Sequence, residues 1–362
     1  MIKYLTNPNN IESNAINIVN NLATDRNINE IFVFPDVHIS TLESIPVGVC
    51  FTSNVDKFYP LVSGKDIGCG VAFCRIPEKY IQNNIVKSSF YNHFSKVVHS
   101  FTDEGLGGGN HFLSIEKDSV ENYYIVCHTG TRNNGISFYQ RSLSLLEDFR
   151  IISGINDINY IDVDYLNEPS DDKKSLLSDG NFFKEYNNLL EYSKNRRIKF
   201  IDKTLNYLFK ANILLGSALE NVEIYDSIHN YIEFKKDCNI HRKGVTGFNS
   251  TNSIVACPMS MTRGTIYVTQ NYSDAQNSCA HGAGRKFSRN DALNYWNSSL
   301  KKKERLEYYK NFPEYLTNGE FTKDIITEFD FCYKNDEEWL TSQPHIRKVW
   351  KSEPILTVKI IS

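Results

Sequence analysis

Short apolar runs that end in turns recur along this chain of 362 residues. Each run has the length of one β-strand and is too short for a typical globular helix. Examples lie at 30–34, 47–52, 71–76 and 123–127, and the turn at 105–109 reads Gly-Leu-Gly-Gly-Gly. Because glycine lets the backbone pass close to a neighbour, this pattern predicts buried strands joined by tight turns.

Helical segments alternate with these strands. Residues 11–22 carry apolar side chains at helical spacing, residues 181–211 contain neither glycine nor proline, and residues 289–316 are helical in pattern and highly charged. Further strands are predicted at 222–225, 254–257, 266–268 and 355–361. We therefore expect an α+β fold with a mixed β-sheet core flanked by helices. It would form a single domain over 1–362, with a helical insertion at about 136–216.

Composition and charge exclude several classes of protein. Hydrophobic residues make up 41% and charged residues 23%, which is ordinary for a globular protein and argues against a disordered or coiled-coil chain. The 40 lysines and arginines against 43 aspartates and glutamates give a net charge of −3. A nucleic acid would therefore have to be held by a local basic patch, because the whole molecule has no positive field.

The sequence predicts neither export nor membrane insertion. The start, MIKYLTNPNN, lacks the basic and apolar regions of a secretory signal, and no apolar stretch approaches the ~18–20 residues that cross a bilayer. The eight cysteines form no Cys-x-x-Cys pair, so we expect reduced thiols. We therefore expect a cytoplasmic protein.

Four of the nine histidines share a setting that suits metal ligands, because they follow strands or lie in glycine turns. They are His111, His128, His229 and His281. Asp66 and Cys69 lie three residues apart in another glycine-rich turn. A carboxylate, a thiolate and imidazoles together suit Zn²⁺, Co²⁺, Fe²⁺ or Mn²⁺, and one thiolate can bridge two ions. No short-spacing metal template fits the intervals, and any one of these histidines alone is as readily a hydrogen-bonded structural residue.

His281 differs from the other three because glycines frame it and Arg285 follows four residues later. A guanidinium pairs with phosphate oxygens through two hydrogen bonds, and a neutral imidazole is a nucleophile toward phosphorus. The alternative is that the Gly-Ala-Gly sequence simply lets a turn pass close to a neighbouring strand. The residues alone leave both interpretations open.

Several strings in fixed order carry a resemblance to a known family. They are PDVH, GKDIGCGV, GLGGGNHF, HTGTR, IHN, HRKG, CAHGAGRKFSR and EPILTVK. In these strings, from Pro35 to Lys359, the chain resembles the RtcB family of GTP-dependent RNA-splicing ligases. It is shorter than typical members, mainly in its middle and C-terminal parts.

The resemblance implies an RNA ligase that joins a 3′-phosphate or 2′,3′-cyclic phosphate end to a 5′-hydroxyl end, in RNA repair or tRNA splicing. Such enzymes use GTP and two Mn²⁺ ions. A histidine attacks the α-phosphorus of GTP, the guanylyl group passes to the RNA 3′-phosphate, and attack by the 5′-hydroxyl releases GMP. Two alternatives remain, namely a ligation-deficient RNA-binding protein of the same fold and a two-metal phosphodiesterase acting on RNA ends.

The resemblance also assigns residues. His281 falls on the guanylylated histidine. The metal ligands would be Asp66, Cys69 and His111 for one ion, and Cys69, His128 and His229 for the other. The nucleotide would be bound by Asn110, Asn230, Ser260, His281, Gly282, Ala283, Gly284 and Lys359. The RNA phosphates would meet Arg132, Arg196 and Arg285.

Other basic clusters and partners follow from the same comparison. We expect phosphate contacts from 194–197, 241–243 and 285–286, and we expect the lysines at 301–303 to form a solvated helix face. The partner would be tRNA or rRNA with the matching ends. We expect a monomer, and the sequence does not specify whether a protein activator is required.

Two departures concern the base of the nucleotide. The family usually has a glutamate three residues after the Asn-His pair, where this chain has Ser114, and Glu116 lies one pleat further on the same strand face. The loop 258–262 lacks two glycines that the family usually has. His38, like His93, His99 and His345, is interpreted as a structural residue, although Asp36 and His38 share a strand face from which they could reach the metal site from outside its ligands.

Overall fold

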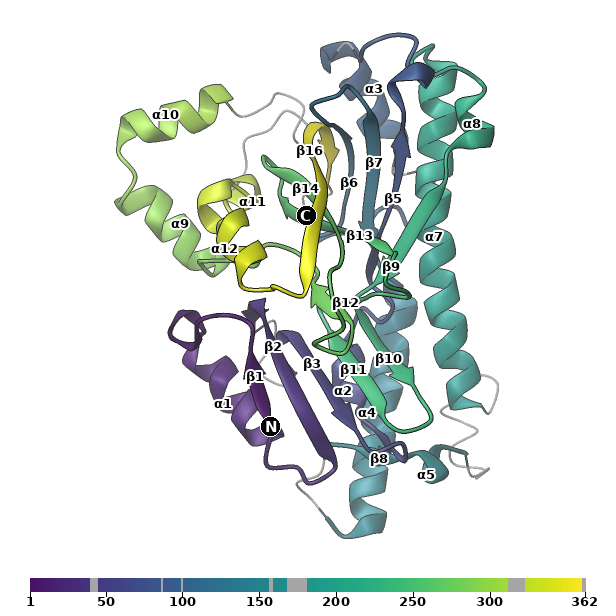
Figure 1. Cartoon of the computed structure of the whole chain (residues 1–362), viewed down its shortest axis with the longest axis vertical. Helices are drawn as coiled ribbons and strands as arrows, with labels where there is room; N and C mark the ends of the chain where they lie inside the picture. Colours follow the sequence, from purple (N-terminus) through teal and green to yellow (C-terminus); the bar gives the residue numbers. More distant parts are fainter. Residues whose placement is uncertain are drawn as a thin grey trace.

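The structure is a computed structural model that describes residues 1–39, 45–85, 87–98, 100–155, 159–167, 181–311 and 323–359. Two β-sheets lie one above the other along the long axis of the molecule, and helices cover their outer sides (Figure 1). The arrangement is the α+β fold that the sequence predicts.

The upper sheet has seven strands in the order β13-β14-β16-β6-β7-β5-β9, and every neighbouring pair in it is antiparallel. The strands are β5 (Gly70–Ile76), β6 (Phe112–Lys117), β7 (Tyr123–Thr129), β9 (Ile224–Ile228), β13 (Ile254–Ser260), β14 (Gly264–Gln270) and β16 (Ile346–Val358). Apart from the consecutive pairs β6–β7 and β13–β14, neighbours in this sheet come from distant parts of the sequence, so its full order could not be inferred from chain order.

The lower sheet has five strands in the order β1-β2-β3-β11-β10. They are β1 (Ile2–Tyr4), β2 (Ile28–His38), β3 (Val47–Ser53), β10 (Asn230–Phe234) and β11 (Asn239–Lys243). The β1–β2 pair is parallel and the others are antiparallel, which makes the sheet mixed, as expected. Two small ribbons complete the strands: β12 (Val245–Gly247) with β15 (Ser278–Ala280), and β4 (Lys57–Phe58) with β8 (Ile161–Asp162).

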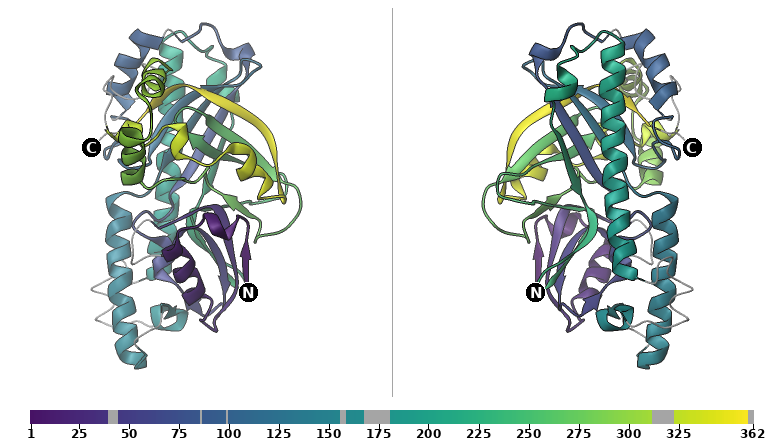
Figure 2. Two further views of the ribbon diagram at one scale, coloured as in Figure 1. Left: turned by 90° about the vertical axis from the view of Figure 1, so that its left-hand side faces the viewer. Right: turned by 90° about the vertical axis from the view of Figure 1, so that its right-hand side faces the viewer.

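One helix, α7 (Phe182–Lys210), joins the two halves of the molecule (Figure 2). Its 29 residues give it a length of roughly 43 Å. Phe182 belongs to the apolar core beside the lower sheet, whereas Phe200 and Leu205 belong to the core beneath the upper sheet. The helix begins where the side chain of Asn181 accepts a hydrogen bond from the backbone N–H of Lys184.

The remaining helices lie at the margins of the sheets. They are α1 (Ser13–Leu22), α2 (Pro60–Ser63), α3 (Lys87–Val98), α4 (Asn133–Ser153), α5 (Val163–Asn167), α8 (Ala218–Asn221), α9 (Arg289–Ser298), α10 (Lys302–Asn311), α11 (Lys323–Ile326) and α12 (Asp336–Thr341). Short 3₁₀ turns occur at Pro8–Asn10, Glu78–Tyr80 and Asp330–Cys332. The group α9–α12 lies beside β16, on the left of Figure 1.

Most predicted elements are confirmed. The predicted segments contain elements of the predicted type, with small changes at their ends. These elements are helices α1 and α7 and strands β2, β3, β5, β7, β9, β13 and β14. Strand β16 starts nine residues earlier than predicted, at Ile346, and residues 360–361 and 312–316 lie outside the described residues. The segment 136–216 is helical where it is described, but α7 within it packs on β5 and β7, so its status as an insertion stays a prediction.

Two further expectations concern the state of the cysteines and membrane insertion. All eight cysteines are free thiols, and seven are buried. Among the described residues, no helix combines the length and the apolar character that crossing a membrane requires.

Candidate metal centre and nucleotide cavity

A cavity of about 700 Å³ holds the candidate site. Its wall includes Asp36 and His38 from β2 of the lower sheet, and Val71 and His128 from β5 and β7 of the upper sheet. His281, which follows β15, lines it as well. Because both sheets contribute to the wall, the cavity exists only when the two sheets are packed together.

Asp66, Cys69 and His111 form the first group of potential ligands, and their ligand atoms all lie within 4.8 Å of one another. The Nε2 atom of His111 lies 2.8 Å from Asp66 Oδ2 and 3.6 Å from the sulfur of Cys69. Oδ1 of Asp66 is buried and has no hydrogen-bond partner in the structure. A buried carboxylate oxygen without a donor costs free energy, and a bound cation would remove that cost.

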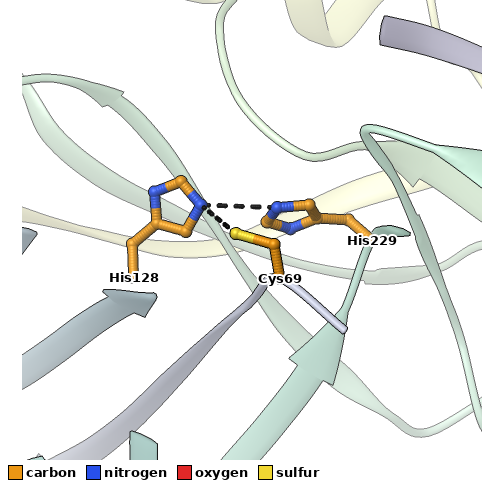
Figure 3. A group of neighbouring side chains, drawn as sticks. All are labelled: Cys69, His128 and His229. Carbon is orange, nitrogen blue, oxygen red and sulfur yellow. Dashed lines mark hydrogen bonds between the residues drawn. The ribbon is translucent and has the colours of Figure 1, made fainter. Parts of the chain in front are cut away.

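Cys69, His128 and His229 form the second group, and all three are buried (Figure 3). The Nε2 atom of His128 lies 3.3 Å from the Cys69 sulfur and 3.3 Å from Nε2 of His229. Since Cys69 belongs to both groups, one sulfur stands between two potential cation sites. The structure therefore brings the five predicted side chains together in two groups that share Cys69, and their assignment as metal ligands stays a prediction.

The ring nitrogens of this second group are in the form that a metal requires. Nδ1 of His128 lies 3.1 Å from the backbone oxygen of Asn110 and donates its proton there, which leaves the lone pair on Nε2 facing Cys69. Burial, followed by the neighbouring histidines, lowers the pKa of both His128 and His229 well below the usual range. Both rings are therefore neutral near pH 7.

The local backbone explains why these side chains meet. In the antiparallel pairs, Gly70 of β5 lies opposite Thr129 at the end of β7 and opposite Ile228 at the end of β9. The strand ends thus bring together Cys69, just before β5, His128 within β7, and His229, just after β9. A Cβ atom at Gly70 would lie 2.3 Å from the backbone oxygen of Ser227, so only glycine permits this approach.

A buried arginine on α7 fixes the same strand ends. The Arg197 guanidinium donates to the backbone oxygens of Gly68 and Thr129 at 2.7 and 3.0 Å, and it forms an ion pair with Asp226 of β9 at 2.5 Å. Its side chain is fully buried. Since the guanidinium joins the turn before Cys69 to the strand that carries His128, helix α7 positions the ligands of the candidate metal site.

His281 lies against the second ligand group. The centre of its ring is 4.5 Å from that of His229 and 6.4 Å from that of His128. Nδ1 of His281 lies 2.6 Å from Asp36 Oδ2 and 2.8 Å from the backbone oxygen of Gly244. Both neighbours accept hydrogen bonds, so Nδ1 carries a proton and, in the neutral ring, Nε2 has the free lone pair.

Asp36 controls the charge of His281. Burial alone would lower the pKa of His281, but the Asp36 carboxylate outweighs burial and holds that pKa above its usual value. The approach is close, since a Cβ atom on Gly284, whose φ is +71°, would lie 2.5 Å from the Asp36 Cα. The sequence places Asp36 on one strand face with His38, from which it could reach the metal site, and the structure places its carboxylate against His281.

Comparison with known proteins agrees with this geometry. A family model described as tRNA-splicing ligase RtcB matches residues 92–360. The chain belongs to the RtcB family. The RNA-splicing ligase RtcB2 of Escherichia coli (strain ATCC 25922) is 23% identical over 321 residues, which cover 78% of this chain and 75% of the E. coli protein. Membership places the chain among RNA ligases. Asp36, Asp66 and Cys69 precede the residues that the family model matches. Their place beside the other site residues therefore comes from the structure and not from the match.

The residues that the RtcB resemblance assigns to a nucleotide all line the cavity. They are Asn110, Asn230, Ser260, His281, Gly282, Ala283, Gly284 and Lys359. The side chains of Asn230, Ser260, His281 and Lys359 have partners within the protein. The Asn230 side chain accepts from the backbone N–H of Gly244 at 2.8 Å, and the Lys359 ammonium lies 3.1 Å from Glu328.

The arginine predictions from the RtcB resemblance require a correction. Arg196 is buried, and its guanidinium donates to Thr129 Oγ1 and to the backbone oxygens of Gly130 and Gly105. It is therefore a structural residue with no face for RNA. The side chains of Arg197, His241 and Arg242 are also buried, so most of the clusters 194–197 and 241–243 is excluded from phosphate contact.

Other basic residues line the cavity or lie near it, and phosphate contact by them stays a prediction. Lys243 and Lys286 line the cavity, and burial lowers the pKa of Lys243 to about 8. Arg285 also lines the cavity, although it donates to Thr327 O at 2.7 Å and to Tyr333 OH at 3.1 Å. Arg132 lies outside the cavity wall, close to Gly107 near His111.

Two residues of the cavity were missed by the sequence analysis. Glu328 and Tyr333 both line it, and the Tyr333 hydroxyl donates to Glu328 at 2.6 Å. Glu328 also pairs with Arg289 at 2.8 Å. No spacing in the sequence distinguishes Glu328 from the other acidic residues of this charged region. Only its burial beside Lys359 identifies it.

Proposed function

We propose that this chain is an RNA ligase that joins 3′-phosphate or 2′,3′-cyclic phosphate ends to 5′-hydroxyl ends through a guanylylated His281. The observation that carries the proposal is the environment of His281. Its Nδ1 proton is held between Asp36 and Gly244 O, and the same ring lies 4.5 Å from a potential metal ligand. A nucleophilic imidazole beside a cation site is the arrangement that phosphoryl transfer from a nucleotide requires.

The residues of the chain account for the first step. Nε2 of His281 has the lone pair that attacks the α-phosphorus of GTP, and a bond to pyrophosphate breaks as the N–P bond forms. Asp36 stabilises the positive charge that develops on the ring, because its carboxylate accepts a hydrogen bond from Nδ1–H at 2.6 Å. The proton stays on the imidazole. Lys243 and Lys286 in the cavity wall supply positive charge near the phosphates.

Two Mn²⁺ ions fit the donor set of the two ligand groups. Asp66, Cys69 and His111 would hold one ion, and Cys69, His128 and His229 the other. When bound, such ions withdraw charge from phosphate oxygens. The mixture of one carboxylate, one thiolate and three imidazoles also suits Zn²⁺ or Fe²⁺, so the identity of the metal rests on the RtcB family.

The proposed substrates are tRNA or rRNA with 3′-phosphate and 5′-hydroxyl ends. The guanylyl group would pass from His281 to the RNA 3′-phosphate, and attack by the 5′-hydroxyl would then expel GMP. The cavity is large enough for a nucleotide, since ligand sites commonly span 300–1,000 Å³ and this one measures about 700 Å³. A cytoplasmic location and a monomeric state stay predictions.

Incubation with GTP labelled at its α-phosphorus in the presence of Mn²⁺ tests the proposal. We expect a labelled protein whose bond is acid-labile and alkali-stable, as a phosphoramidate is. His281→Ala should abolish the label, whereas His93→Ala, which removes an exposed imidazole from α3, should keep it. Absence of label from the unaltered chain would contradict the mechanism.

The same experiment separates the two alternatives. A ligation-deficient RNA-binding protein would retain RNA without forming the label. A two-metal phosphodiesterase would hydrolyse cyclic phosphate ends without GTP and would tolerate His281→Ala, because water would be its nucleophile. The Asp36–His281 contact favours the ligase, since a hydrolase has no need for an oriented imidazole beside its metal ligands.

A further inference from the structure

Asp36 lies where strand β2 leaves its regular ladder with β3. The register shift in the β2–β3 pair leaves residues 34–37 facing a single residue, Gly48. These residues form a bulge, so the ladder does not fix their backbone. One contact comes from within the strand, since Nδ1 of His38 lies 2.8 Å from the backbone oxygen of Asp36. Because a rotation of the bulge would carry the Asp36 carboxylate away from the imidazole, its position requires contacts from outside the strand.

A buried lysine from a distant part of the chain makes such a contact. Lys334 is 6% exposed and lies between the 3₁₀ turn Asp330–Cys332 and α12. Its ammonium donates a hydrogen bond to the backbone oxygen of Pro35, the residue before Asp36. Lys334 does not line the cavity. It therefore holds the bulge through the interior of the protein and not through contact with a ligand.

The backbone of Lys334 holds the loop that carries His281. The N–H of Lys334 donates to the backbone oxygen of Gly284 at 3.0 Å. An antiparallel bridge between Arg285 and Tyr333 joins the same two segments one residue away. One lysine thus bonds the bulge through its side chain and the loop of the candidate nucleophile through its backbone.

The bulge and the loop also touch each other directly, so a shift of either one changes the distance between Asp36 and His281. A Cβ atom on Gly284 would lie 2.5 Å from the Asp36 Cα and 3.1 Å from the backbone oxygen of Pro35. The oxygen of Pro35 is the atom to which the Lys334 ammonium donates. The lysine is therefore bonded to the point where the two segments meet.

The hairpin between β13 and β14 holds Lys334 in turn. The Arg263 guanidinium donates to the backbone oxygen of Lys334 at 2.8 Å and to Oδ1 of Asp336 at 2.6 Å. The backbone of Lys334 is thus bonded at both its N–H and its C=O group. Its side chain consequently starts from a fixed point on its way to Pro35.

Stability alone is a poor explanation for a lysine at this position. Burial lowers the pKa of Lys334, and the carboxylate of Asp36 opposes this effect. Moving an ammonium out of water costs free energy, and an apolar side chain of similar volume would fill the space at lower cost. Beside Asp36 the positive charge has a use, because Oδ1 of this buried carboxylate has no hydrogen-bond partner in the structure.

We propose that Lys334 is a positioning residue for the candidate nucleophile, because it fixes the Asp36 bulge against the loop of His281. The inference rests on the proposed function in one respect, namely that His281 attacks the nucleotide. Since Lys334 lies outside the cavity wall, its loss should act on the rate of attack and not on nucleotide binding.

The rate of His281 labelling by GTP, with the full-length chain and Mn²⁺, tests the inference. Lys334→Met should lower the maximal rate about tenfold, because the carboxylate that orients the ring is no longer held in place. The GTP concentration that gives half of this rate should change by less than about twofold. A maximal rate within twofold of that of the unaltered chain would overturn the inference. So would an unchanged rate at saturation with a large rise in that concentration.

Two further variants separate positioning from a general loss of packing. Lys57→Met is the matched control, since it removes another largely buried lysine, which pairs with Asp162 far from the cavity wall, and it should label at the normal rate. Lys334→Gln stays polar but is shorter by one bond, so it should show the same fall in rate as Lys334→Met. If Lys334→Met does not fold, Lys334→Gln decides, and a normal rate in it would refute the inference.

A spectroscopic measurement distinguishes failure of this inference from failure of the proposed chemistry. In nuclear magnetic resonance spectra of the chain with isotope-labelled histidine, the Nδ1 proton of His281 should resonate far downfield, because Asp36 accepts it at 2.6 Å. Lys334→Met should shift or broaden this resonance, and Lys57→Met should not. Such a change without labelling of the unaltered chain would keep the contact and reject the ligase mechanism. Labelling of the unaltered chain, with rate and resonance both unaffected by Lys334→Met, would reject the inference alone.

Discussion

Asp36 gives His281 both its orientation and its protonation form. The carboxylate is fully buried, and its Oδ2 lies 2.6 Å from Nδ1 of the imidazole. Gly244 O accepts from the same nitrogen, so the ring cannot turn its other nitrogen toward the carboxylate without losing two hydrogen bonds. At the scale of single residues, this contact is what converts a histidine near a metal site into a candidate nucleophile.

Replacement of Asp36 by asparagine should slow the labelling of His281 by GTP by about 10²-fold or more, because an amide neither fixes the tautomer nor stabilises the imidazolium. The rate at saturating GTP and Mn²⁺ measures the effect. Asp148→Asn, on the exposed side of α4, is the matched control and should label normally. A rate for Asp36→Asn within twofold of that of the control would contradict the role given to Asp36.

Cys69 belongs to both groups of potential metal ligands, so its removal affects both candidate cation sites. Cys69→Ala should therefore weaken both Mn²⁺ sites together, and titration with Mn²⁺ followed by electron paramagnetic resonance of the free ion should show no tight site. Cys74→Ala, at a buried thiol of β5 that lies in the apolar core, serves as the control. Retention of one tight site in Cys69→Ala would show that the thiolate does not bridge.

At the scale of elements, the ends of β5, β7 and β9 and one side of α7 form the frame of the metal centre. Arg197 reaches from the helix to two backbone oxygens and to Asp226. A buried guanidinium with these partners holds strand ends in register more rigidly than apolar packing alone. The helix that sequence analysis placed in an insertion thus has a direct part in positioning the ligands.

Arg197→Met should lower the free energy of unfolding by about 3–5 kcal/mol, since it leaves Asp226 as a buried and unpaired charge. Urea unfolding followed by circular dichroism measures the loss. Lys194→Met, one turn earlier on the exposed side of α7, should change stability by about 0.5 kcal/mol or less. Equal stability of the two variants would show that Arg197 is not a structural support.

At the scale of the whole molecule, the cavity is formed where the two sheets meet, so its chemistry depends on the stability of the complete fold. His241 illustrates how pH enters that stability. It stacks on Phe51 with ring centres 4.5 Å apart and contacts Ser53 Oγ at 2.8 Å. Burial lowers the pKa of His241 to about 3.

Acidification should therefore destabilise the protein. Between pH 6.5 and pH 3 the unfolded chain binds a proton at residue 241 that the folded chain excludes, so stability falls as the pH falls. His241 alone should remove about 2 kcal/mol between pH 7 and pH 5. Urea unfolding at both values should show a smaller pH effect in His241→Phe than in the unaltered chain, and equal effects would contradict the assignment. Other buried histidines contribute equally to both proteins and cancel.

The local features of this protein can be predicted from its sequence. Strands such as β5 and β7 and the long helix α7 follow from apolar runs and from the absence of glycine and proline, which act within a few residues. The resemblance to the RtcB family, carried by short strings such as the turn around Asp66 and Cys69, named side chains that the structure brings together around Cys69 and His281, and their roles as ligands and nucleophile stay predictions. These strings are local because each depends on a single turn.

Which side chains meet and which are buried depends on the packing of segments that are distant in the sequence. Arg196 and Arg285 have the same side chain, yet one is closed within the protein and the other lines the cavity, because burial depends on neighbours far away in sequence. The Asp36–His281 contact joins residues 245 positions apart, and Glu116 of β6 accepts hydrogen bonds from Thr265 of β14 and Ser352 of β16. Pairing between distant strands fixes these contacts, and no local pattern records it.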